Sequence, residues 1–273
     1  MTDSNEPVPV TDVEEGVAEP ATEKEKEKKS VTHQLVFWSM NILGFAPIVV
    51  WFVIADKRIA VTVSTALTVL NFFLSLVYYK IGGTKCWPKV IDVSLVTTFG
   101  ILLILIWALP EEGAYVKSDV IAYFDAWIFG GFAADITSAW VCFKVPFAKQ
   151  LYMDEVSEEE LTHPGTKYLI KETTLAFICG FGMAGVFAIV RGSLMVTGKN
   201  TNTLDIVMQV LMWCSVAYGI NMAAWVLPKY STTDKFNNMI AEKYGEEVEA
   251  WNAKHPDHEW AKEWAKAIEA ETE

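Results

Sequence analysis

Four polar side chains lie within stretches of the chain that are otherwise apolar, and these are the residues that could do chemistry. They are Asn71, Asp125, Asp135 and Asn221. A carboxylate or amide at membrane depth is costly unless it is paired or hydrated, so such residues often line a path for a proton, a cation or a small solute. The same side chains can instead hydrogen-bond across helices and only fix the packing. For Asp135, near the middle of its segment, both interpretations stay open.

Other chemistry is not indicated by the sequence. Three acids stand at the starts of apolar segments, where a packing role is the better interpretation: Asp92, Glu172 and Asp205. His255 and His258 have no third ligand nearby in the sequence, which favours a solvated turn over a zinc site. No P-loop, HExxH, GxSxG or dinucleotide fingerprint occurs. We therefore expect no enzymatic activity, no cofactor and no metal.

The polar residues belong to six apolar segments, each near the ~20 residues with which a helix crosses a bilayer. The segments run over 34–55, 59–79, 90–109, 119–145, 168–190 and 204–228. The composition agrees, with 52% hydrophobic residues among 273. Lipid cannot satisfy the edges of an open sheet. The sequence therefore predicts an all-α, polytopic membrane bundle of six transmembrane helices.

Two consecutive segments carry small residues at every fourth position. In 119–145 these are Ala122, Ala126, Gly130, Ala134, Ser138 and Cys142, and in 168–190 they are Ala176, Gly180, Ala184 and Ala188. Such a spacing lets a neighbouring helix backbone approach closely. We expect the fourth and fifth segments to pack against each other, with Gly130 and Gly180 each tolerating alanine but not leucine.

Three regions differ in composition. Residues 1–30 form an acidic tail with few large apolar side chains and are predicted to be disordered. Residues 31–230 form the transmembrane domain. Residues 231–273 form an acidic, amphipathic helical tail, whose apolar stripe consists of Phe236, Ile240, Tyr244, Val248 and Trp251. The net charge of −12 lies almost wholly in the two tails, which excludes a nucleic-acid partner.

The distribution of lysine and arginine predicts the orientation. With six crossings, the flanks and loops on the side of the termini hold fourteen of these residues, against five on the other side. The positive-inside rule then places both termini in the cytoplasm or its topological equivalent. The membrane would be a plasma or inner membrane, or that of an organelle.

The stretch from the end of the fourth segment through the fifth resembles the bacterial septation protein A group. The resemblance rests on Pro146, Phe147, Gln150, Asp154, Glu155, Phe177, Cys179 and Gly180, with Asp92 and Gly100 in the preceding helix, and extends diffusely over residues 40–228. It implies a multi-pass membrane protein with a role in envelope maintenance and septum formation, without known catalysis.

The sequence thus favours a non-catalytic membrane scaffold or envelope-associated factor. The alternative is a transporter or channel for a small solute, ion or proton, with a polar site around Asp135 and Asn221. A lipid-modifying enzyme ranks third, because the sequence offers no nucleophile. The expected partners are the lipid bilayer and, through the C-terminal helix, a second copy of the chain or another membrane protein.

Overall fold

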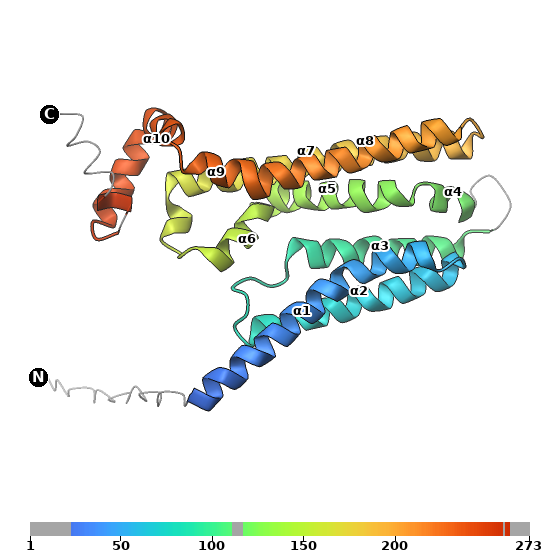
Figure 1. The fold of residues 1–273 in the computed structure, drawn as a ribbon, viewed down its shortest axis with the longest axis horizontal. Coiled ribbons are helices and arrows are strands. Elements are labelled where there is room, and N and C mark those ends of the chain that lie inside the picture. The colour runs from blue at the N-terminus through green and yellow to red at the C-terminus, as the bar shows by residue number, and fades with distance from the viewer. Residues whose placement is uncertain (1–22, 111–116, 259, 263–273) are drawn as a thin grey trace, which may run out of the picture.

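The described structure is wholly helical apart from its loops and turns. The computed structural model describes residues 23–110, 117–258 and 260–262 (Figure 1). Its helices are α1 (Glu23–Val53), α2 (Lys57–Lys80), α3 (Val90–Ala108), α4 (Lys117–Ala122), α5 (Phe124–Phe143), α6 (Phe147–Glu155), η1 (Glu160–Thr162), α7 (Pro164–Val196), α8 (Asn202–Asn221), η2 (Met222–Val226), α9 (Leu227–Ser231) and α10 (Asp234–Lys254).

Six of the described helical stretches are long and apolar enough to cross a membrane, which confirms the predicted fold class. They are Gln34–Trp51, Lys57–Lys80, Val90–Ala108, Phe124–Phe143, Pro164–Val196 and Asn202–Ser231. The sixth stretch contains the single π turn η2, which joins α8 to α9. The predicted fourth helix is interrupted at Tyr123, where φ of −95° and ψ of 12° separate α4 from α5.

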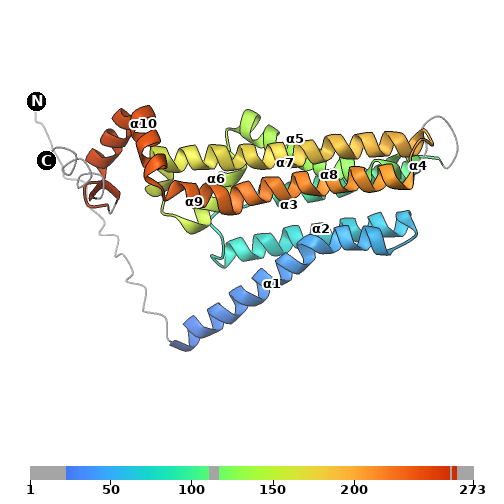
Figure 2. The same ribbon diagram turned by 45° about the horizontal axis from the view of Figure 1, so that its top comes forward.

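The transmembrane helices form two groups of three. In both views α1 and α2 lie side by side, as do α7 and α8 (Figures 1 and 2). Helix α3 packs on α2 and also on α4 and α5, while α7 lies against both α5 and α8. The Trp51 ring of α1 stacks on Phe124 of α5, with 3.9 Å between the ring centroids, so an aromatic pair also joins the groups.

The start of α1 and the C-terminal helix α10 lie at the same end of the molecule (Figure 1). Helix α1 begins at Glu23 and so includes residues 23–30, which had been predicted to be disordered. Glutamate and lysine have high helix propensity, and extending an existing helix is far easier than starting one. Residues 1–22 of the predicted tail lie outside the described residues.

The small residues of α7 serve two different neighbours. A methyl group on Gly185 would lie 2.9 Å from the Gly130 Cα, so α5 and α7 make their close contact there. A methyl group on Gly180 would lie 2.7 Å from the Gly219 Cα and 2.9 Å from the Ser215 carbonyl oxygen, both on α8. The expectation that Gly180 faces the fourth segment was therefore wrong, because its side of α7 is covered by α8.

The small residues of α5 contact α7 only over part of its length. Ala184 and Ala188 are buried with Phe129 of α5 and Met212 of α8, whereas Ala134, Ser138 and Cys142 are exposed. Four residues turn a helix by about 400°, so a four-residue spacing rotates steadily around the axis. From Ala134, about one turn beyond Gly130, the small residues of α5 are exposed.

Gly180→Ala should destabilise the protein, in contrast to the tolerance that the sequence suggested. The new methyl group meets backbone atoms, which cannot move aside, so we expect a loss of about 1–3 kcal/mol, typical of overpacking. Gly182→Ala is the matched control, because a methyl group there has nothing within 4 Å. Thermal unfolding in detergent measures both variants. Equal stability of the two variants would refute the close α7–α8 contact.

Candidate functional site

The four polar residues singled out in the sequence do not meet in the structure. Asn71 is buried on α2, and its amide nitrogen lies beside Gly44 of α1. Asp125 and Asp135 lie more than two turns apart on α5. Asp135 is half-buried, and among the described residues it has no hydrogen-bond or ion-pair partner. Asn221 is exposed at the end of α8.

Asp125 belongs instead to an ionic triad with Arg191 and Asp205. The Arg191 Nη1 donates to the Asp125 Oδ2 at 2.6 Å, and Nε donates to the Asp205 Oδ1 at 2.8 Å. Asp125 lies in the first turn of α5, Arg191 in the last turns of α7, and Asp205 in the first turn of α8. A single guanidinium therefore connects three transmembrane helices at one end of the bundle.

Further hydrogen bonds complete the surroundings of the triad. Asn200 and Gln209 donate their amide N–H groups to Asp205, at 3.0 Å and 2.9 Å. Tyr123 and Ser193 share a hydrogen bond of 3.0 Å beside the triad. The side chains of the three charged residues are only 14–22% exposed. Charges so far removed from water need such partners, since breaking a buried pair leaves an uncompensated charge.

The ion pairs of the triad join helices and leave each of its charges with a partner. Arginine does not release its proton in proteins, so it cannot serve as an acid or base. Both carboxylates are occupied by the guanidinium. The sequence offered Asp125 and Asp205 but could not pair them with Arg191, because Arg191 follows Asp125 by 66 residues.

At the opposite end of the bundle, helix α6 fastens the loop between α2 and α3. Asp154 accepts hydrogen bonds from the Thr84 hydroxyl, the Lys85 amide and the Lys89 ammonium group, each at 2.8 Å. Burial raises the pKa of the Asp154 carboxyl, but the hydrogen bonds from Lys89, Lys85 and Thr84 outweigh it and hold the pKa below the usual aspartate value. Gln150 Oε1 accepts from the Val90 amide at 2.8 Å and so satisfies the start of α3.

Phe147, in the first turn of α6, anchors this helix to the transmembrane helices. Its buried ring lies 5.8 Å from that of Phe132 on α5 and 5.1 Å from that of Phe177 on α7. The Ala148 amide donates to the Thr174 hydroxyl of α7 at 3.2 Å. Phe147, Gln150, Asp154 and Phe177, which carry the family resemblance, thus link α6 to its neighbours.

The C-terminal helix α10 packs on the start of α7. Phe236, Ile240 and Val248 form a buried cluster that also includes Tyr168 of α7 and Tyr230 of α9. These residues belong to the predicted apolar stripe, which confirms the amphipathic helix. Trp251, also buried, donates its indole N–H to the Thr162 hydroxyl at 2.9 Å. The far end of α10 is thereby attached to the segment just before α7.

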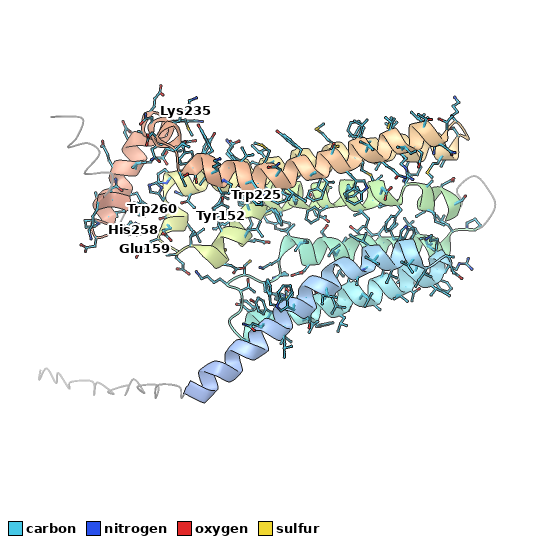
Figure 3. All side chains as sticks on the ribbon, viewed as in Figure 1. Tyr152, Glu159, Trp225, Lys235, His258 and Trp260 are labelled. Carbon is cyan, nitrogen blue, oxygen red and sulfur yellow. The ribbon has the colours of Figure 1, made fainter. Side chains whose placement is uncertain are left out.

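Three histidines surround Trp251 at this contact. His255 and His258 lie 3.6 Å from Glu159 and 3.8 Å from Glu160, respectively, and Figure 3 shows Glu159, His258 and Trp260 together below α10. His163 precedes α7, and its Nδ1 accepts a hydrogen bond from the Gly165 amide at 3.1 Å. Burial, and then the charges of His258 and Lys167, lower the pKa of the His163 imidazole to about 4.

The comparisons with known proteins found no relative. No protein-family model matches the chain, and neither the search of curated proteins nor that of solved structures found a match. The class of the protein follows from its fold: six described helices are long and apolar enough to cross a membrane, which defines a multi-pass membrane protein. The resemblance to the septation protein A group stays a prediction.

Removing the guanidinium of the triad should strongly destabilise the bundle. Arg191→Met leaves two largely buried carboxylates without a cation, and we expect a loss of about 3–5 kcal/mol in unfolding free energy. Adding Asp125→Asn and Asp205→Asn should recover part of it, because neutral amides are easier to bury. Lys199→Met, an exposed change at the same end of the bundle, is the control. Thermal unfolding in detergent measures all variants, and equal stability of Arg191→Met and Lys199→Met would contradict a structural triad.

Docking of α10 should weaken in mild acid. The undocked chain protonates His163 below its ordinary pKa of about 6.5, whereas the docked form resists protonation until about pH 4. Docking is therefore strongest above pH 6.5 and weakens as the pH falls toward 4. His163→Asn keeps an N-cap acceptor that cannot titrate, so hydrogen exchange in α10 should be slower than in wild type at pH 5 and similar at pH 7.5. If the ratio of the wild-type to the variant exchange rate in α10 is the same at both pH values, His163 does not control the pH dependence of docking.

Proposed function

We propose that the protein is a non-catalytic membrane scaffold with both termini on the cytoplasmic side. The observation that carries the proposal is the Asp125–Arg191–Asp205 triad, in which the charges of α5, α7 and α8 neutralise one another. An intramembrane charge that binds a solute must be free to contact it. The charges of the triad are instead paired with one another between helices. Rigidly joined helices suit a protein that presents a fixed surface.

The C-terminal helix supplies a surface that such a scaffold could present. Its apolar face is buried on α7 and α9, and the acids of its other face are exposed: Asp234, Glu242, Glu246, Glu247 and Glu249. An acidic surface held in place attracts basic partners and repels anionic lipid. We therefore infer a partner protein with a basic surface on the cytoplasmic side.

The resemblance to the septation protein A group supports a role in envelope maintenance or septum formation. The residues behind the resemblance make structural contacts in this chain: Gln150 caps α3, and Asp154 binds the loop before it. Contacts of this kind fit a family without known catalysis. The lysine and arginine bias supports the cytoplasmic placement of the termini.

A transporter or channel for a small solute is the second candidate, and Asp135 favours it. This half-buried carboxylate in mid-helix has no partner among the described residues. An intramembrane acid without a partner is a functional hypothesis in its own right. The two candidates therefore assign function to different parts of the chain, the C-terminal region and α5.

Complementation of cells that lack the protein distinguishes the two candidates. For a scaffold, a chain ending at Ser231 should insert in the membrane but fail to restore envelope morphology, while Asp135→Asn should restore it fully. For a transporter, the chain ending at Ser231 should restore envelope morphology and Asp135→Asn should fail to do so. In liposomes, purified wild type should then take up a solute or carry protons, and Asp135→Asn should abolish this transport. Full activity of the truncated chain would overturn the scaffold proposal.

A further inference from the structure

Helix α2 turns its polar side inward. Its buried residues include four polar ones at successive turns of one face, each at most 5% exposed: Ser64, Thr68, Asn71 and Ser75. Its exposed residues are mostly apolar, among them Val63, Leu70, Phe73 and Val77. The apolar side suits lipid, and the polar face of α2, defined by these four residues, is enclosed by neighbouring helices.

All three hydroxyl groups on this face have partners, whereas the Asn71 amide oxygen finds none in the part of the chain that the structure describes. Ser64 donates to the Pro47 carbonyl at 2.7 Å, Thr68 to the Thr65 carbonyl at 2.8 Å, and Ser75 to the Asp92 Oδ2 at 2.6 Å. The Asn71 Oδ1 is fully buried and has no hydrogen-bond partner among the described residues. Buried polar atoms in proteins are almost always satisfied, since each orphan costs about 1–3 kcal/mol.

The buried carboxylate of Asp92 lacks a counter-ion in the described part of the chain. It is 4% exposed, and among the described residues no cation forms an ion pair with it. Lys89, one turn earlier, directs its ammonium group to Asp154 at 2.8 Å. The start of α3 supplies a partial positive charge of about half a unit, which leaves the carboxylate incompletely neutralised. A buried carboxylate requires a counter-charge or a proton.

We propose that Asn71, Ser75 and Asp92 bind one monovalent cation, with Na⁺ as the best match. Asn71 and Ser75 are four residues apart on one helical face, about 5–6 Å between their Cβ atoms, and Ser75 touches Asp92 directly. A cation that takes oxygen ligands at about 2.3–2.6 Å, as Ca²⁺ of similar radius does, spans that separation. The ion would give the Asn71 amide oxygen a bonding partner and the Asp92 carboxylate a counter-charge.

The charge and type of the ligands select the ion. Carboxylate, amide and hydroxyl oxygens are hard ligands, which suit alkali and alkaline-earth cations. One carboxylate balances one positive charge, whereas a divalent ion would leave an uncompensated charge at membrane depth. No group of three or more histidine, cysteine or acidic residues among the described residues could hold a transition metal. Asp92 lies in the first turn of α3, so the ligands are close to one end of the membrane-spanning helices.

The site goes beyond the scaffold role and does not depend on it. Its ligands come from α2 and α3, and Asn71 also lies beside Gly44 of α1. A bound ion would therefore hold the first group of three helices together, as Arg191 holds the second. Sodium should raise the free energy of unfolding by RT ln(1 + c/Kd), where c is the Na⁺ concentration and Kd the dissociation constant, since a ligand that binds only the folded state shifts the unfolding equilibrium.

Thermal unfolding of the purified full chain in detergent tests the site. NaCl well above the dissociation constant should raise the midpoint by about 3–6 °C relative to choline chloride at equal ionic strength, and the rise should grow with the logarithm of the NaCl concentration. KCl should raise the midpoint less. Asn71→Leu and Asp92→Asn should each abolish the difference between the salts. Ser64→Ala, on the same face but two turns from the ligands, and Asp135→Asn, outside the site, should keep the wild-type response.

Direct binding of radioactive ²²Na⁺ to the wild type keeps the test decisive if a variant does not fold. Saturable binding at about one ion per chain, lost in the milder variant Ser75→Ala or in Asn71→Leu, would establish the site. Equal midpoints in sodium, potassium and choline chloride, together with no ²²Na⁺ binding, would overturn it and assign the space to an internal water. Loss of the sodium response in Asp135→Asn but not in Asp92→Asn would also overturn it.

Discussion

The hydrogen-bonded ion pairs of Arg191 are the interaction on which the arrangement of α5, α7 and α8 depends. One guanidinium satisfies Asp125 and Asp205, and through them it fixes the ends of three helices. Small residues then permit close approach further along, at Gly185 toward α5 and at Gly180 toward α8. Lipid offers no hydrophobic drive for helix association, so polar contacts and tight packing must supply it.

The other helix group, α1 to α3, is held together by hydrogen bonds from the polar face of α2. The polar face of α2 turns inward, toward Pro47 of α1 and Asp92 of α3. Trp51 and Phe124 then join the two groups across their boundary. Each group therefore has its own polar attachment, and the contact between them is mainly apolar.

The two ends of the bundle differ in character, which bears on function. One end carries the triad, while the other carries α6, the loop between α2 and α3, and α10 (Figure 1). The second end is ordered by the hydrogen bonds and the ion pair to Asp154 and by the hydrogen bond from Trp251 to Thr162. The acidic surface for which we propose a basic partner lies at that end.

The sequence by itself determined the six membrane helices and the amphipathic α10, because hydrophobic length and periodicity are local properties of the chain. It also marked Asp125, Asn71 and Gly180 as unusual for their surroundings. Only the tertiary structure decided their partners: Arg191 is 66 residues from Asp125, and Gly180 meets Gly219 of α8 rather than α5. Those partners depend on how each helix is rotated about its axis, and rotation is set by all the neighbours at once.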